Sequence, residues 1–154
     1  MLKYADYDIV FQEIPNEVTL AINISNCPNR CVGCHSPYLM EDVGEELNET
    51  SLDALIEKYG KDVTCICFMG GDADHKSVAS LAHYIKEKYQ PLKVGWYSGK
   101  PNLPESFPLA DFDYIKVGPY REDCGPLNSR TTNQRLYSIF NGELMDITSK
   151  FWRK

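Results

Sequence analysis

Three of the six cysteines lie within one segment of eight residues, at Cys27, Cys31 and Cys34. A disulfide framework does not suit this spacing, because the loops between the cysteines are too short for the geometry of the bond. Three thiolates on one short loop can instead converge on a single iron–sulfur cluster without a ligand from elsewhere in the chain. We therefore predict a cluster on these three residues, with one iron left open to another molecule.

Zinc is the alternative occupant of the same thiolates. A structural zinc site needs four tetrahedral ligands, and His35 directly follows Cys34 instead of standing at a ligand spacing. The motif therefore favours a cluster. The other cysteines lack the spacing of a second cluster: Cys65 and Cys67 are predicted to be small buried side chains on one face of a strand, and Cys124 lies in a late loop.

Strands are predicted wherever the chain has short runs of apolar and β-branched residues. Four such runs cover residues 18–24, 63–69, 92–97 and 113–117. An N-terminal strand or hairpin is expected around residues 7–11, and a terminal hairpin over residues 136–147, where Asn141-Gly142 separates two apolar runs.

Helices are predicted between these strands. Thr50 or Ser51 can cap a helix that ends at Gly60, and a second helical pattern around residues 78–85 ends before Pro91. A short helix is expected within residues 101–108. Because strands alternate with helices, the pattern indicates a parallel sheet whose functional loops follow the carboxyl ends of its strands.

The cysteine loop, placed after a strand, resembles the Cys-x3-Cys-x2-Cys signature of the radical S-adenosylmethionine superfamily. The resemblance implies an α/β fold, an incomplete open (βα) barrel with a mostly parallel sheet, and one 4Fe-4S cluster held by Cys27, Cys31 and Cys34. In that superfamily the open iron chelates S-adenosylmethionine, and an electron from the cluster releases methionine and a 5′-deoxyadenosyl radical.

Further positions resemble the cofactor-binding residues of the superfamily. Gly70, Gly71 and Asp72 match its Gly-Gly-Glu element, which orients the methionyl amino group. Asp replaces Glu, and whether Asp72 acts by side chain or backbone stays open. On its own, a Gly-Gly turn indicates only a connection from strand to helix. Ser98 matches a position near the nucleoside, although residues 96–99 can also be read as core aromatics that close a strand.

Lys116 lies on a strand that resembles the one from which activating enzymes direct an Asp and a Lys toward S-adenosylmethionine. Alternation along residues 113–117 points Asp113 and Lys116 to opposite faces. We therefore take Lys116 as a cofactor-binding residue and expect Asp113 to be structural.

Residues 126–135, which include Asn133 and Gln134, resemble the tail of the activating proteins of anaerobic class III ribonucleoside-triphosphate reductases. This resemblance implies that the radical abstracts hydrogen from a glycine of the reductase, forming a glycyl radical. It also implies reduced flavodoxin or ferredoxin as the electron donor. Two alternatives stay open: an activase of another glycyl-radical enzyme, such as pyruvate formate-lyase, and a non-enzymatic metal-binding module.

The composition is that of one globular domain. A chain of 154 residues with 43% hydrophobic residues suits a single domain over residues 1–154. The net charge of -6 argues against nucleic acid or an anionic membrane surface as a partner. Because the N-terminus lacks the pattern of a signal peptide and no apolar stretch is long enough for a membrane span, we expect a cytoplasmic protein.

Overall fold

The fold is described from a computed structural model of the chain. The described residues are 2–11, 14–15, 17–25, 44–104, 107–119, 121, 123–124, 130, 132–140 and 142–151. The predicted cluster ligands Cys27, Cys31 and Cys34 lie outside these ranges, as does His35.

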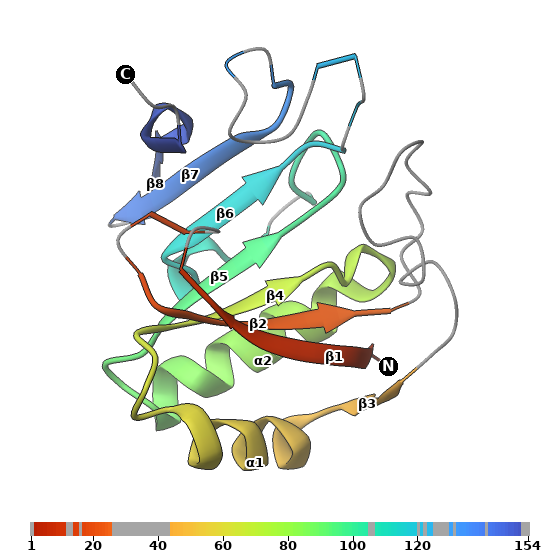
Figure 1. The fold of residues 1–154 in the computed structure, drawn as a ribbon, viewed down its shortest axis with the longest axis vertical. Helices are drawn as coiled ribbons and strands as arrows, with labels where there is room; N and C mark the ends of the chain where they lie inside the picture. The colour runs from red at the N-terminus through yellow and green to blue at the C-terminus, as the bar shows by residue number, and fades with distance from the viewer. Residues whose placement is uncertain are drawn as a thin grey trace.

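The described strands form one eight-stranded sheet (Figure 1). Along the chain the strands are β1 (Leu2–Val10), β2 (Thr19–Ile24), β3 (Glu45–Leu47), β4 (Cys65–Met69), β5 (Lys93–Tyr97), β6 (Tyr114–Val117), β7 (Arg135–Phe140) and β8 (Glu143–Asp146). Their order across the sheet is β3-β1-β2-β4-β5-β6-β7-β8. Strands β2, β4, β5 and β6 are parallel neighbours at its centre.

The expected α/β class is confirmed, but the expectation of a mostly parallel sheet is wrong. Four of the seven strand pairings are antiparallel: β1 with β2, β1 with β3, β6 with β7, and β7 with β8. Short connections join β1 to β2 and β7 to β8, and strands joined in this way pair antiparallel, whereas an α-helix stands in each connection from β2 to β4 and from β4 to β5, which are parallel. The predicted terminal hairpin is therefore correct and supplies one of the antiparallel pairings, that of β7 with β8.

Helices α1 (Glu49–Tyr59) and α2 (His75–Lys88) run beside each other along the strands (Figure 1). The N-cap of α1 is Asn48, not Thr50 or Ser51: its side-chain oxygen accepts from the Ser51 amide at 2.9 Å, and Ser51 Oγ accepts from the Asn48 amide. This reciprocal capping box explains why the helix begins earlier than predicted. Gly60 ends it, as predicted.

The described part of the proline-containing segment differs from the prediction. Its one helical element is a 3-10 turn, η3 (Leu109–Asp111), just beyond the expected range. Among the described residues, no helix is long and apolar enough to cross a membrane.

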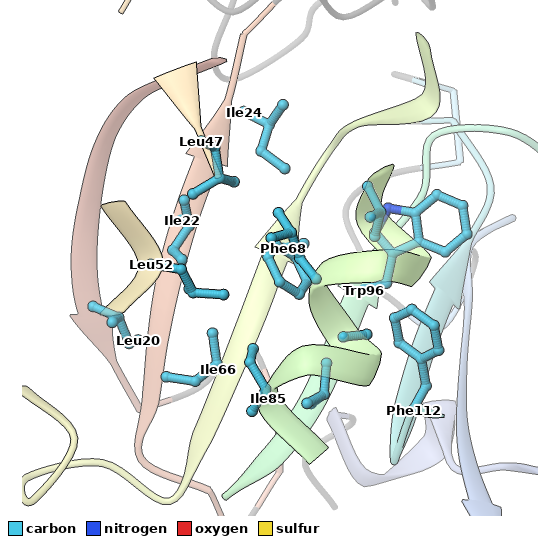
Figure 2. Close-up of a cluster of buried hydrophobic side chains, with 14 of the residues drawn as sticks. Leu20, Ile22, Ile24, Leu47, Leu52, Ile66, Phe68, Ile85, Trp96 and Phe112 are labelled. Carbon is cyan, nitrogen blue, oxygen red and sulfur yellow. The ribbon is translucent and has the colours of Figure 1, made fainter. Parts of the chain in front are cut away.

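Both helices pack on the same face of the sheet. Alternate strand residues point into this layer, including Leu20, Ile22 and Ile24 from β2, Ile66 and Phe68 from β4, and Trp96 from β5 (Figure 2). Helix residues Leu52 and Ile85 meet them there (Figure 2). This is the main core of the protein, and it leaves the opposite face of the sheet without a covering helix among the described residues.

The segment before β2 closes the amino end of that opposite face. Ile14 is fully buried there and packs with Cys65 and Cys67. The buried Glu17 carboxylate accepts hydrogen bonds from Tyr114 Oη at 2.6 Å and Lys93 Nζ at 2.9 Å. It also accepts from Thr64 Oγ1 at 2.7 Å. Glu17 thereby connects β5, β6 and the residue just before β4 at this end of the sheet.

Candidate functional site

The predicted cofactor-binding residues gather at the carboxyl edge of the parallel strands. Gly70 follows β4, Ser98 follows β5 and Lys116 stands one residue before the end of β6, and these strands are parallel neighbours. The cysteine segment begins just after β2, the next parallel strand, although its residues are outside the described part. Carboxyl ends of parallel strands meet at one edge, which is where α/β proteins bind ligands.

The turn at Gly70 and Gly71 is held in a conformation that favours glycine, with φ of 110° and 93°. The Trp96 indole N–H donates to the Gly70 carbonyl at 2.6 Å, and the Gly70 amide donates to the Tyr97 carbonyl at 3.0 Å. A Cβ at Gly71 would come within 2.6 Å of Val78 Cγ2. The turn is therefore fixed against β5 on one side and α2 on the other.

The side chains of Asp72 and Ser98 contact each other, although they follow different strands. The Ser98 hydroxyl donates to one Asp72 carboxylate oxygen at 2.5 Å, and the Gly99 amide donates to the other at 2.8 Å. Asp72 and Ser98 are both buried. The Asp72 side chain thus ties the loop after β4 to the loop after β5.

Lys116 is buried on the face that carries no described helix. Its ammonium donates to the Gly118 carbonyl at 3.0 Å and lies 5.3 Å from the centroid of the Tyr97 ring. As the alternation predicts, Asp113 faces the other way: it accepts from the Val94 amide at 2.9 Å and forms an ion pair with Lys86 of α2. Asp113 thus has structural partners on the helical side of the sheet.

A row of side chains crosses this face, and the sequence reasoning identified only its last member, Lys116. Strand register places Asp6, Asn23, Met69, Tyr97 and Lys116 next to one another in that order on neighbouring strands. The Asn23 amide donates to the Asp6 carboxylate at 2.6 Å. A sequence signal existed, because four of these residues stand at or next to the carboxyl end of a predicted parallel strand.

Cys65 and Cys67 are buried, as predicted, and lie on the same face of the sheet as this row, nearer the amino end of β4. Burial is the main reason that the pKa of the Cys65 thiol is raised far above its ordinary value, so the thiol stays protonated at neutral pH. Protonated thiols are poor metal ligands. No group of three or more His, Cys, Asp or Glu that could hold a metal occurs among the described residues.

Comparison with known proteins supplies the class of the chain. Residues 17–103, more than half of the chain, match the family model of the 4Fe-4S single cluster domain. The chain therefore belongs to the 4Fe-4S single cluster domain family, and its function depends on an iron–sulfur cluster. No curated protein and no solved structure matches the chain.

Proposed function

We propose that the protein activates an anaerobic class III ribonucleotide reductase by reductive cleavage of S-adenosylmethionine. The 4Fe-4S cluster, when bound, supplies the electron for this cleavage, and the resulting 5′-deoxyadenosyl radical takes a hydrogen atom from a glycine of the reductase. Reduced flavodoxin or ferredoxin is the proposed electron donor. The proposal makes the protein an oxidoreductase, a class consistent with its cluster domain.

One observation carries the proposal. The cysteines of the matched cluster domain stand at the spacing Cys27-x3-Cys31-x2-Cys34, which provides three thiolates and leaves one iron available to a second ligand. A domain that only stored a cluster would have no need of an open iron.

The described residues at the carboxyl edge suit the groups of S-adenosylmethionine. Gly70 and Gly71 hold a turn with positive φ at this edge, and its backbone is the proposed contact of the methionyl amino group. The buried Lys116 ammonium suits a carboxylate. The Asp72 carboxylate has a role within the protein, because it accepts hydrogen bonds that hold Ser98 and Gly99 in place.

The architecture supports the fold that the resemblance implies. Four parallel strands at the centre of the sheet, with both described helices on one face, are the arrangement expected of an incomplete (βα) barrel. We propose that the opposite face is the interior of this open barrel and that a glycine-containing segment of the reductase enters there.

The proposal is tested by anaerobic reconstitution of the cluster, followed by reduction in the presence of S-adenosylmethionine. We expect 5′-deoxyadenosine as a product. An intact, reduced cluster that yields no 5′-deoxyadenosine would contradict the proposal and favour the non-enzymatic metal-binding module.

Cysteine variants make the test specific. Replacing Cys27, Cys31 or Cys34 singly with Ala should abolish both the bound 4Fe-4S cluster and the product. The same replacement at Cys65 or Cys67 serves as the matched control, since these thiols are buried beneath the site, and should leave the iron content unchanged.

A further inference from the structure

Two buried side chains converge on one backbone oxygen beside the proposed site. The Gly118 carbonyl accepts from Lys116 Nζ at 3.0 Å and from Gln134 Nε2 at 3.2 Å. Lys116 is 7% exposed and Gln134 is 8% exposed, so neither contact is weakened by competing bulk water. A carbonyl oxygen has two lone pairs and can accept both hydrogen bonds at once.

The segment before β7 also fixes the rest of this turn. Asn133 Nδ2 donates to the Pro119 carbonyl at 3.0 Å, and the backbone amide of Gln134 donates to Thr132 Oγ1 at 3.1 Å. Gly118 has a φ of 110°, and a Cβ there would lie 3.1 Å from Gln134 Cα. Residues 132–134 therefore pack directly against the glycine turn, whose Gly118 amide also donates to the Lys100 carbonyl at 2.7 Å.

We propose that Gln134 is a positioning residue that acts through Lys116, with Asn133 holding the neighbouring carbonyl. The proposal rests on the proposed function, in which Lys116 contacts S-adenosylmethionine. Gln134 fixes the Gly118 carbonyl, and this carbonyl fixes the Lys116 ammonium above the Tyr97 ring. In this proposal Asn133 and Gln134 support the cofactor site without touching the cofactor.

The physical argument depends on the flexibility of lysine. The ammonium sits at the end of a four-carbon stem with many rotamers, so a fixed acceptor is needed to hold it in one place. If the side-chain amide of Gln134 is removed, the Gly118 carbonyl loses one of its two donors and the turn becomes more mobile. The ammonium then samples more positions around the Gly118 carbonyl.

The first experiment measures Lys116 directly, without a cofactor. Reductive methylation of the full chain, followed by mass spectrometry, gives the labelling rate of each lysine. In Gln134→Leu and Gln134→Met, neither of which can donate to Gly118, Lys116 should react about fivefold faster than in the wild type, as expected for the loss of one hydrogen bond. Gln90→Leu makes the same change at an exposed glutamine and should leave the Lys116 rate unchanged.

The second experiment asks whether Gln134 works through Lys116. In the reconstituted protein, Gln134→Leu should raise the dissociation constant of S-adenosylmethionine about tenfold. In a Lys116→Met background the same change should add nothing, because the group that Gln134 positions is gone. A merely structural role for Gln134 would give additive losses.

The outcomes separate the inference from the function on which it rests. An unchanged Lys116 labelling rate in both Gln134 variants, or additive losses in the double variant, would overturn the inference. Failure of the wild-type protein to bind S-adenosylmethionine would overturn the proposed function, and the labelling rates would still decide whether Gln134 holds Lys116.

Discussion

The Asp72 carboxylate connects the loop after β4 to the loop after β5. It accepts from Ser98 Oγ and from the Gly99 amide, and because Asp72 and Ser98 are buried, the Ser98 hydroxyl cannot turn to water if the carboxylate is removed. We expect Asp72→Ala to lower the free energy of unfolding by about 2 kcal/mol, because it leaves a buried donor unsatisfied. Urea denaturation measures this change.

Ser98→Ala is the control for that measurement. It removes one donor and leaves the Asp72 carboxylate bound to Gly99, so it should lower the free energy of unfolding by about 1 kcal/mol. Equal losses for the two variants would show that the carboxylate does not join the loops as described.

Gly71 and Gly142 allow a prediction about the glycine turn with a matched control. Both have a positive φ, 93° and 77°, so alanine at either position is strained by about 1 kcal/mol. At Gly71 the added Cβ would also meet Val78 Cγ2 at 2.6 Å, whereas nothing lies within 4 Å at Gly142. Gly71→Ala should therefore destabilise the protein by about 2 kcal/mol more than Gly142→Ala.

Thermal or urea unfolding of the two glycine variants tests this difference. The shared backbone strain cancels in the comparison, which leaves the contact with α2. If the two variants were equally stable, the close packing of the turn against α2 would be contradicted.

At the scale of elements, Glu17 joins segments that are distant in sequence, at the amino end of the parallel strands. Burial alone would raise the pKa of its carboxyl. Hydrogen bonds from Tyr114, Lys93 and Thr64 outweigh burial and hold this pKa below its ordinary value. Since the carboxyl titrates at about 4.3 in an unfolded chain, its ionised form stabilises the fold fully above that pH. This stabilisation is lost as the pH falls through the lower pKa of the folded state.

Glu17→Gln isolates this effect, because it keeps the shape of the side chain and removes its charge. We expect the variant to be about 2 kcal/mol less stable than the wild type at pH 7, the range for hydrogen bonds to a charged group. The difference should shrink as the pH falls below about 4. Unfolding free energies measured from pH 7 to pH 3 test this, and a difference that does not change with pH would contradict it.

The sequence predicts elements better than it predicts their contacts. The central strands are predictable because their residues are continuously apolar or β-branched, and Gly60 marks the end of α1. Asn48 is not predicted as the N-cap because the usual signature of a capping box has Glu or Gln at N3, and here N3 is Ser51. Strand β3 was missed because its residues, Glu45 to Leu47, pair only with the distant β1.

The candidate site shows the same division between types of residue and their partners. Gly70, Gly71 and Lys116 are candidates through their resemblance to cofactor-binding positions of the superfamily, since their place at strand ends alone would not single them out. The bond from Ser98 to Asp72 spans 26 residues, and the bond from Gln134 to Gly118 spans 16. Local pattern cannot reveal such bonds, since they depend on which strands become neighbours in the sheet.

At the scale of the whole molecule, the sheet has two different ends and two different faces. Antiparallel hairpins flank the parallel centre, and the described helices cover one face only (Figure 1). Glu17 and Ile14 close the amino edge, while the carboxyl edge carries the glycine turns and Lys116. We propose that the carboxyl edge is the one that meets S-adenosylmethionine and the reductase.

The measurement that tests the central claim most directly is electron paramagnetic resonance of the partner enzyme. The reconstituted protein is incubated anaerobically with S-adenosylmethionine, a reductant and a class III ribonucleotide reductase, with pyruvate formate-lyase as a parallel substrate. We predict a glycyl radical signal on the reductase and none on pyruvate formate-lyase. A reduced 4Fe-4S cluster that generates no radical on the reductase would contradict the account.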